Sequence, residues 1–475
     1  MKSPSVLPLA TLGERSSRAV WHPCTPLRAS TQGAGETPLA IARGEGPWLF
    51  DTDGRRYFDA TSSWWVNLFG HANRAINAAL TAQIETLEHV MLAGCTHAPA
   101  VELAERLSDL TGGALGHAFY ASDGASAVEI ALKMSFHYWR NVGLPGKTEF
   151  ACLQHGYHGE TIGALAVTDT PIFRDAYASL LRRAHVVRSP DARQARQDES
   201  ATQVAARALA ELESLFRERS GQIAALIVEP LVQCAAGMAM YDPSYLDGAR
   251  ALCDRYRVHL IADEIAVGCG RTGTFFAWEQ ARGLDMGLPA LAWPDFLCLS
   301  KGISGGYLPL SLVLSRPAIQ QAFVADDLGR SFLHSHSYTG NPLACRAALA
   351  TLDVFEQDDV IENNRQRAQW LADAMAPLGS DRRLQHVRQR GLIWAADVRP
   401  EVAGTNFAAR FHYTAREHGV LIRPIGNTIY VMPPYVFDAE GAKWLASRLE
   451  ATLAIVASSC TEGEVRIDSE GRRAA

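Results

Sequence analysis

The 475-residue sequence lacks several features that mark whole classes of protein. Its nine cysteines are scattered, with no CxxC pair, and an odd number of thiols in a chain of this length does not indicate a disulfide framework. We therefore expect reduced thiols in the cytosol and no metal site. A formal charge of −6 leaves no basic excess that would favour binding to nucleic acid or to a membrane surface.

Long apolar runs are also missing. Glu229 interrupts the longest candidate, so no segment predicts a membrane span. The first residues form a short apolar stretch that is broken by Pro8 and lacks the cationic lead of a signal peptide. The sequence contains no internal repeat. These absences predict a cytoplasmic protein whose ligands are small molecules.

The central part of the chain has an α/β pattern. From about residue 100 to 330, short apolar runs alternate with longer amphipathic stretches. The strand-like runs at 225–228, 258–262 and 296–299 are nearly continuously apolar, which is typical of strands covered by helices on both faces. The pattern predicts a three-layer α/β/α domain around a mostly parallel sheet.

The two ends of the chain have a different pattern. Turn residues at 51–54 separate strand-like residues around 48–50 and 56–58, and a helix predicted over 344–356 precedes mixed strands and helices. We predict a large domain over residues 81–343. A smaller α+β domain is expected to combine residues 1–80 with residues 344–475.

An aspartate and a lysine follow two neighbouring predicted strands. Asp263 ends the run 260–262, and Lys301 comes soon after the run 296–299. Because ligands collect at the carboxyl edge of open α/β sheets, we expect both side chains in one crevice. Pyridoxal phosphate (PLP) requires a lysine that holds its aldehyde and a carboxylate that keeps its ring nitrogen protonated. For the pair alone, a structural ion pair or two separate surface charges is the alternative.

Two loops add to this pair. Residues 121–129 form a small-residue turn that leads into a helix, and free amides at a helix start bind phosphate. Simple capping by a serine or an aspartate is the alternative. Tyr157 lies in the loop 155–160, after a strand-like run, where its ring can stack on a flat cofactor. An ordinary turn between glycines explains this tyrosine as well.

Taken together, these segments resemble the class III aminotransferases of the fold-type I PLP-dependent family, over nearly the whole chain. The most specific parts are residues 261–265, Gly270-Arg271-Thr272-Gly273, the Lys301 segment and residues 337–344. The resemblance implies a fold-type I transferase that forms a homodimer with shared active sites. It also implies that Lys301 is the catalytic lysine, linked covalently to PLP and moving protons during the reaction.

The resemblance assigns a set of residues to the cofactor. Backbone amides bind the phosphate, a tyrosine packs on the ring, an aspartate pairs with the ring nitrogen, and a histidine and a serine reach the phosphate from the partner subunit. In this sequence the implied PLP-binding residues are Gly124, Ala125, Tyr157, Asp263, Lys301, His336 and Ser337.

Further motifs are similar to members of the class that aminate 8-amino-7-oxononanoate in biotin biosynthesis, with S-adenosylmethionine as donor. They include 21–23, 62–65, 96–99, 238–241, 422–424 and 430–435. This substrate is a long apolar chain with a distal carboxylate, which aromatic walls and an arginine would suit. The predicted substrate-binding residues are Cys24, Trp64, Trp65, Tyr157, Ser335, Arg423 and Tyr430. Core packing is the alternative for the aromatic residues, and a surface salt bridge for Arg423.

Two positions depart from the pattern of these proteins. Ala125 stands where relatives often have serine, which removes a hydroxyl but keeps the amide. Cys24 follows His-Pro where many have tyrosine, which removes an aromatic substrate contact and leaves lysine as an alternative donor.

Three other functions remain open from the sequence. A different ω-aminotransferase, using ornithine, 4-aminobutyrate or β-alanine, would keep the cofactor residues but lack the Trp64-Trp65 pair and the surroundings of Arg423. A decarboxylase or aminomutase on the same fold would bind PLP identically. A non-enzymatic regulator is disfavoured because Lys301 and Asp263 are both present and no DNA-binding segment is recognisable.

Overall fold

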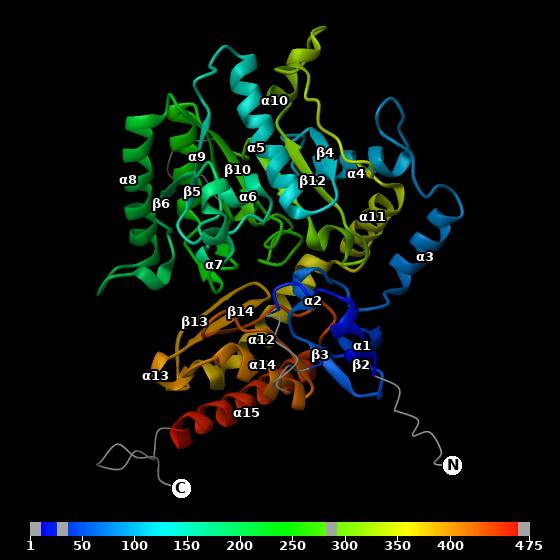
Figure 1. Cartoon of the computed structure of the whole chain (residues 1–475), viewed down its shortest axis with the longest axis vertical. Helices are drawn as coiled ribbons and strands as arrows, with labels where there is room; N and C mark the ends of the chain where they lie inside the picture. The colour runs from blue at the N-terminus through cyan, green and yellow to red at the C-terminus, as the bar shows by residue number, and fades with distance from the viewer. Residues whose placement is uncertain (1–10, 26–36, 282–291, 464–475) are drawn as a thin grey trace, which may run out of the picture.

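A seven-stranded sheet lies at the centre of the upper half of the molecule (Figure 1). The structure, a computed structural model, describes residues 11–25, 37–281 and 292–463. In spatial order the strands are β4 (His117–Ala121), β12 (Ser311–Ser315), β11 (Phe296–Leu299), β10 (His259–Asp263), β7 (Ile223–Val228), β5 (Glu149–Leu153) and β6 (His185–Val187). Only β12 runs antiparallel to its neighbours. The prediction of a mostly parallel sheet is confirmed.

Helices bury both faces of this sheet. Ala225 and Ile227 of β7 pack in one apolar cluster with α5 (Gly124–Asn141). Leu226 and Val228 face the opposite way, into the cluster that contains α9 (Ser244–Tyr256). Every residue of β7 and β10 is buried, which explains why their sequences do not alternate between apolar and polar residues.

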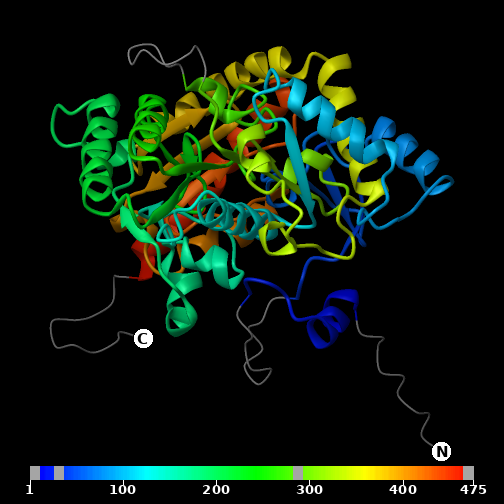
Figure 2. The ribbon, with the colours of Figure 1, turned by 90° about the horizontal axis from the view of Figure 1, so that it is seen from above.

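The other elements of the upper half surround these layers. They are α3 (Arg74–Ile84), α4 (Ala98–Asp109), α6 (Ile162–Ala166), α7 (Pro171–Arg174), α8 (Ala201–Arg219), α10 (Pro317–Gln321), α11 (Pro342–Gln357) and the 3-10 turns η2 (Asp175–Leu180), η3 (Ala192–Gln194), η4 (Ala277–Gln280), η5 (Lys301–Ser304) and η6 (Leu328–Arg330). Helices α3, α4 and α11 lie side by side in both views (Figures 1 and 2). Because α11 also packs on η5, it supports the turn that begins with Lys301.

A four-stranded sheet in the lower half joins the two ends of the chain, and two further small sheets are each formed within one part of the chain (Figure 1). The first has the order β1 (Ile41–Glu45), β2 (Trp48–Asp51), β3 (Arg56–Asp59) and β15 (Val420–Leu421), and one of the further sheets has the order β13 (Leu384–Arg390), β14 (Ile393–Val398) and β16 (Thr428–Val431). A two-stranded ladder pairs β8 (Val232–Gln233) with β9 (Ala239–Met240). In the first sheet β15 runs parallel to β3, with Val420 opposite Phe58.

The remaining helices are α1 (Leu12–Ala19), α2 (Ser62–Trp65), α12 (Val360–Gly379), α13 (Pro400–Ala403), α14 (Phe407–Glu417) and α15 (Ala439–Gly463). Of these helices, α12 packs on β13 and β14, and α14 packs on β15. None of the helices in the described ranges combines the length and apolar character needed to cross a bilayer. The domain boundaries after residues 80 and 343 stay a prediction.

Candidate active site

Two adjacent parallel strands bring Asp263 and Lys301 to the same edge of the central sheet. In the pair of β10 and β11, Asp263 lies opposite Cys298, and the chain then enters η5 at Lys301. The backbone of Lys301 is left-handed, with a φ of +46°, which is uncommon for a residue with a side chain. Such conformations are concentrated at functional sites. The two charged side chains therefore occupy the edge where α/β proteins bind ligands.

The Lys301 side chain packs against an aromatic ring. Its Nζ lies 4.9 Å from the centre of the Trp65 ring, a cation–π distance. Burial lowers the pKa of the Lys301 ammonium, and the negative charge of Asp263 opposes this shift. A lowered pKa raises the fraction of free amine, which is the form that attacks a carbonyl and accepts a proton.

Asp263 is held in place by two hydrogen-bonding partners. Its side chain is only 5% exposed, and Oδ2 lies 2.7 Å from Nδ1 of His158. Oδ1 accepts the N–H of Ile265 at 3.1 Å. The other ring nitrogen of His158, Nε2, is buried and has no partner among the described residues. The arrangement presents a fixed carboxylate, as a protonated pyridine nitrogen requires.

The start of α5 reaches the same edge. Asp123 caps the helix by accepting the N–H of Ser126 at 3.0 Å and its hydroxyl at 2.8 Å. The amides of Gly124 and Ala125 precede the first intrahelical bond, so they point out of the helix start without a helical partner. A Cβ on Gly124 would lie 3.0 Å from Cγ2 of Ile265. The absence of a side chain thus lets this potential phosphate-binding helix start approach the end of β10.

The Tyr157 loop lies beside these groups. The N–H of Tyr157 donates to Oε2 of Glu229 at 3.2 Å, and its hydroxyl donates to Oε1 of Glu160 at 2.9 Å. Burial raises the pKa of the Tyr157 hydroxyl, and the charges of Glu160, Cys24 and Asp263 act in the same direction. The two hydrogen bonds thus fix the backbone and the hydroxyl of Tyr157 beside the end of β7.

The chemistry of this set fits PLP. A lysine amine, a buried carboxylate and two helix-start amides lie along one sheet edge, and they suit an aldehyde, a ring nitrogen and a phosphate respectively. Because Gly124 has no Cβ, the helix start lies against Ile265 at the end of β10, next to the Asp263 carboxylate. In the ranges that the structure describes, no group of three or more His, Cys, Asp or Glu residues is arranged to hold a metal ion.

Comparison with known proteins agrees with this geometry. The family model for Aminotransferase class-III matches residues 29–453. The chain belongs to the class III aminotransferases. The aminotransferase is 41% identical over 430 residues to the adenosylmethionine-8-amino-7-oxononanoate aminotransferase of Helicobacter pylori, covering 89% of this chain and 93% of that protein. The protein of the same name from Geobacter sulfurreducens is 36% identical over 457 residues, covering 93% and 97%.

Solved structures give the same result for the fold. An adenosylmethionine-8-amino-7-oxononanoate aminotransferase from Methanocaldococcus jannaschii is similar, with a TM-score of 0.84, 33% identity and coverage of 94% of this chain and 98% of that one. An amine transaminase from an uncultivated Pseudomonas species, in a PLP-bound form, has a TM-score of 0.85 and 32% identity, covering 92% and 99%. The predicted fold type, enzyme class and PLP cofactor are confirmed.

Arg423 links two other exposed residues that are predicted to bind substrate, Trp64 and Cys24, and we term these three residues the mouth. Trp64 is 46% exposed, and the guanidinium carbon of Arg423 lies 5.6 Å from the centre of its ring. Nη2 of Arg423 donates a long hydrogen bond, 3.4 Å, to the carbonyl oxygen of Cys24. Deeper inside, Nε1 of Trp65 donates to the hydroxyl of Tyr430 at 3.2 Å. Contacts thus link five of the predicted substrate residues, Cys24, Trp64, Trp65, Arg423 and Tyr430, while their binding roles stay predictions.

Ser335, His336 and Ser337 lie elsewhere on the chain. The N–H of His336 donates to Oγ1 of Thr339 at 2.9 Å, and the carbonyl of Ser337 lies 2.9 Å from the ring of His89. Residues 335–337 are thus held by contacts with Thr339 and His89, and not by contacts with Lys301. Whether the three residues serve the partner's site stays a prediction.

Two buried residues of the aminotransferase site were not predicted from the sequence. His158 contacts Asp263 directly, and Glu229 accepts the N–H groups of Tyr157 and Cys234. Burial raises the pKa of Glu229 to about 7, although the positive charge of His158 opposes the shift. The sequence signal for Glu229 was a carboxylate directly after an entirely apolar strand. In the sequence this residue stands out only because it interrupts the longest apolar run.

Proposed function

We propose that the aminotransferase transfers an amino group from S-adenosyl-L-methionine to 8-amino-7-oxononanoate, giving 7,8-diaminononanoate for biotin biosynthesis. The observation that carries this proposal is the pair of adjacent tryptophans. Trp65 contacts Lys301 and Trp64 contacts Arg423, so an aromatic wall links the reactive amine with an outer cation. A ketone on an apolar chain with a distal carboxylate matches this order of groups. The names of the relatives support the same substrate.

The proton transfers are assigned to Lys301. When bound, PLP supplies an electron sink that stabilises the negative charge left on the donor carbon. Nζ of Lys301 accepts the proton from that carbon and later returns one to the carbon that receives the amine. Its lowered pKa favours the free amine that the first step needs. The Trp65 ring limits access of water to this nitrogen on one side.

The other buried groups orient and hold charge. The Asp263 carboxylate keeps a proton on the ring nitrogen of the bound cofactor, and His158 fixes the orientation of that carboxylate. The amides of Gly124 and Ala125 hold the phosphate, and Tyr157 covers the ring. At the mouth, Arg423 binds the distal carboxylate of the substrate with charge-assisted hydrogen bonds.

The choice of donor rests on the aromatic faces. A sulfonium cation beside an adenine ring suits the surfaces of Trp64, Trp65 and Tyr157 through cation–π and stacking contacts. Cys24 offers no such face where many relatives have tyrosine. Lysine, which is also cationic, is therefore the competing donor.

A different amine substrate is the second candidate. Several solved structures similar to this chain are ω-transaminases, such as the enzyme from Pseudomonas jessenii with a TM-score of 0.88 and 27% identity. That similarity favours a general amine transaminase. Higher sequence identity, 34 to 41%, is found with eight relatives that bear the oxononanoate name, and we favour their substrate for this reason.

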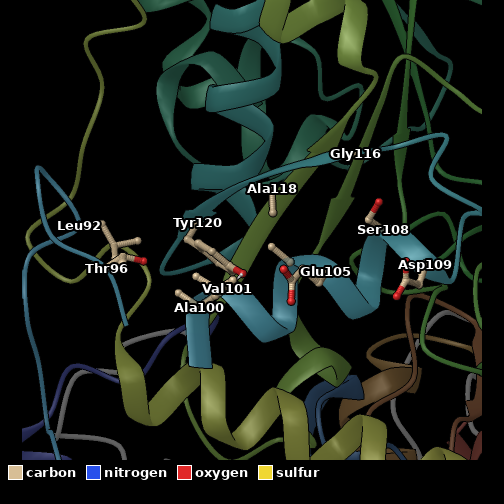
Figure 3. A pocket seen from close by; sticks show the side chains of 11 residues that line it. Leu92, Thr96, Ala100, Val101, Glu105, Ser108, Asp109, Gly116, Ala118 and Tyr120 are labelled. Carbon is tan, nitrogen blue, oxygen red and sulfur yellow. Dashed lines mark hydrogen bonds between the residues drawn. The ribbon is translucent and has the colours of Figure 1, made fainter. Parts of the chain in front are cut away.

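A homodimer with shared active sites is part of the proposal. Beside α4 lies a groove of about 410 Å³, lined at one end by Leu92 and Thr96 and at the other by Ser108 and Asp109 (Figure 3). The segment that holds Ser335, His336 and Ser337 borders this groove, because His97 contacts the carbonyl of Gly340 and His89 contacts that of Ser337. Large apolar side chains nearby are exposed, namely Met91, Val101, Leu110, Leu333 and Tyr338. We propose that a second copy covers this surface and receives His336 and Ser337 at its phosphate.

One assay tests the function. Purified enzyme is mixed with 8-amino-7-oxononanoate and a panel of donors, and diaminononanoate formation is measured. The assay uses a cytoplasmic pH, because we propose that the enzyme is cytoplasmic. Each donor is also mixed with the enzyme alone, and conversion of the cofactor is followed by absorbance. Faster conversion by lysine than by S-adenosylmethionine at equal concentration would overturn the donor. Product from simple amines and ketones, with none from the oxononanoate, would favour the general amine transaminase.

A further inference from the structure

Four consecutive residues with side chains adopt a left-handed backbone at α2. The φ angles are +50° at Ser62, +48° at Ser63, +72° at Trp64 and +73° at Trp65. In this conformation Cβ crowds the following carbonyl, so residues other than glycine adopt it singly and rarely in series. We refer to residues 62–65 as the left-handed turn. Its neighbours must supply the interactions that hold it in this conformation.

One side of the turn is held by Asp59. This side chain is fully buried; Oδ1 accepts the N–H of Ser63 at 2.9 Å, and Oδ2 accepts the Ser63 hydroxyl at 2.6 Å. Nε2 of His71 also lies 3.1 Å from Oδ2, and Nδ1 of that ring lies 3.2 Å from Nδ2 of Asn67. Asp59 therefore fixes both the backbone and the side chain of the second residue in the turn.

A buried arginine holds the other side. Nη2 of Arg271 donates to the Ser62 hydroxyl oxygen at 3.3 Å, and that hydroxyl donates to the carbonyl of Met432 at 2.6 Å. Nη1 of Arg271 donates to the carbonyl of Pro433 at 2.6 Å, and the residue is only 1% exposed. The left-handed turn is thus held between two buried charges of opposite sign, Asp59 and Arg271.

The turn carries the two tryptophans of the site. Trp65 contacts Nζ of Lys301 and donates to Tyr430, while Trp64 lies under Arg423. The loop after Lys301 packs directly on the residues that follow the turn, since a Cβ on Gly306 would lie 2.8 Å from Cα of Asn67. A change in the turn would therefore move both aromatic rings relative to the reactive lysine.

We infer that Asp59 and Ser63 are positioning residues that set substrate specificity by holding the left-handed turn. Their side chains hydrogen-bond to neither Lys301 nor Arg423, and they act through the positions of Trp64 and Trp65. The link to the oxononanoate chain rests on the proposed function. The conformational role of the two residues does not.

The sharpest test compares two substitutions at one position. Ser63→Ala and Ser63→Gly both remove the hydroxyl that Asp59 accepts, but only glycine adopts a φ of +48° without strain. We expect Ser63→Ala to raise the KM for 8-amino-7-oxononanoate about tenfold, with a smaller change in kcat, and Ser63→Gly to stay within about threefold of wild type. Equal KM values in the two variants would overturn the inference.

Asp59 is tested by rescue. Asp59→Asn removes the charge that holds the turn, and we expect a rise in KM of about tenfold or more. Adding Ser63→Gly should restore much of the affinity, because glycine adopts the left-handed conformation without Asp59. Asp51→Asn is the matched control: Asp51 is buried in the adjacent β2–β3 hairpin and accepts the Tyr57 hydroxyl at 2.8 Å. It should lower stability and leave KM unchanged. Absence of rescue in a folded double variant would contradict the role of Asp59.

A second readout needs no substrate. The ten tryptophans are labelled with 5-fluorotryptophan in the cofactor-loaded enzyme, and the signals of Trp64 and Trp65 are assigned by Trp64→Phe and Trp65→Phe. Ser63→Ala and Asp59→Asn should shift or broaden these two ¹⁹F signals, whereas Asp51→Asn should not. Unchanged signals in both variants would overturn the inference. If wild-type enzyme does not aminate the oxononanoate but the signals move as expected, only the proposed substrate fails.

Discussion

The two ends of strand β10 are both buried, yet they are built differently. At the amino end, His259 stacks on Trp139 with ring centres 4.4 Å apart, and its Nδ1 lies 2.9 Å from the Ser135 hydroxyl. Asp295 lies beside the same end, where it pairs with Arg250 at 2.8 Å and accepts the N–H of Leu260 at 2.8 Å. The buried acid and base form an ion pair there, although Nε of Arg250 has no partner in the described ranges, and the strand is regular.

The carboxyl end carries strain and spare hydrogen-bonding capacity. Lys301 has a left-handed backbone, the left-handed turn lies against its side chain, and Nε2 of His158 is buried without a partner in the described ranges. Proteins tolerate such features where function requires them and the surrounding structure holds them. The comparison teaches that one end of β10 stabilises the sheet, while the other presents groups to a ligand. Substitutions at the two ends should therefore separate activity from stability.

Lys301→Ala is expected to have the largest effect on activity. Turnover should fall by about 10²–10⁴-fold from the loss of proton transfer alone, while the fold is retained. The measurements are kcat, the circular dichroism spectrum, and peptide mapping after borohydride reduction of the cofactor link. If mapping of the wild-type enzyme labels another lysine, the assignment of Lys301 is wrong.

Asp263→Asn should have the next largest effect. The substitution keeps the shape but removes the charge that faces the ring nitrogen, so both half-reactions should slow by about 10²–10³-fold. Single-turnover absorbance changes measure each half-reaction separately. Rates close to those of the wild type would show that the Asp263 carboxylate is structural, like the Asp295 carboxylate at the amino end of β10.

Arg250→Met should lower stability and preserve activity, the reverse of what we expect for Lys301→Ala and Asp263→Asn. It removes the nearer of two arginines that pair with the buried Asp295, and Arg316 remains 3.7 Å away. We therefore expect a loss of about 3 kcal/mol in unfolding free energy, the lower end of the range for a broken buried pair. Denaturant unfolding measures the loss, and activity per folded molecule should be retained. Arg43→Met is the control, since the Arg43–Glu45 pair is exposed and should contribute less than about 1 kcal/mol. A folded Arg250→Met enzyme without activity would break the distinction between the two ends.

The pH dependence of stability should reflect His259. Burial lowers its pKa from 6.5 to about 4 in the folded protein, so the unfolded chain binds a proton first as the pH falls. Stability from the neutral imidazole is therefore present above about pH 6.5 and is lost towards pH 4, by about 3 kcal/mol in total. His259→Gln should flatten this part of the profile, measured by denaturant unfolding at each pH. An unchanged slope would place the pH-sensitive group elsewhere.

Arg423→Ala should have the smallest effect, because this residue is exposed at the mouth. Loss of a charge-assisted contact to the substrate carboxylate should cost about 1.5–3 kcal/mol in apparent binding of the ketone. The comparison of the acid with its methyl ester identifies the interaction, since the ester lacks the charge. Equal use of acid and ester by the wild-type enzyme would indicate a structural arginine.

Local patterns were sufficient to predict the central sheet and its reactive pair. The run 296–299 coincides with β11, and a helix predicted over 344–356 lies within α11. Asp263 and Lys301 follow buried strands directly, so their positions at one edge follow from the chain order and parallel pairing. Information of this kind is contained in short stretches of sequence.

Residues that act through distant contacts could not be predicted in this way. His158 and Glu229 belong to the site because separate segments meet there, and no local pattern records that meeting. The residues at 62–65 give no sign of a left-handed backbone, since none is glycine. The contacts that hold it, among them those with Asp59 and Arg271, come from other parts of the chain.

The parallel pair of β3 and β15 has a consequence for biosynthesis. Phe58 lies opposite Val420, so β3 lacks this neighbour until nearly the whole chain has left the ribosome. At about 5–20 residues per second, the delay is on the order of tens of seconds. During this time the seven-stranded sheet, whose strands lie between His117 and Ser315, has all its parts and is free to assemble. The edge of the nascent β1–β3 hairpins stays open for the same period, which leaves it exposed to wrong pairing during synthesis.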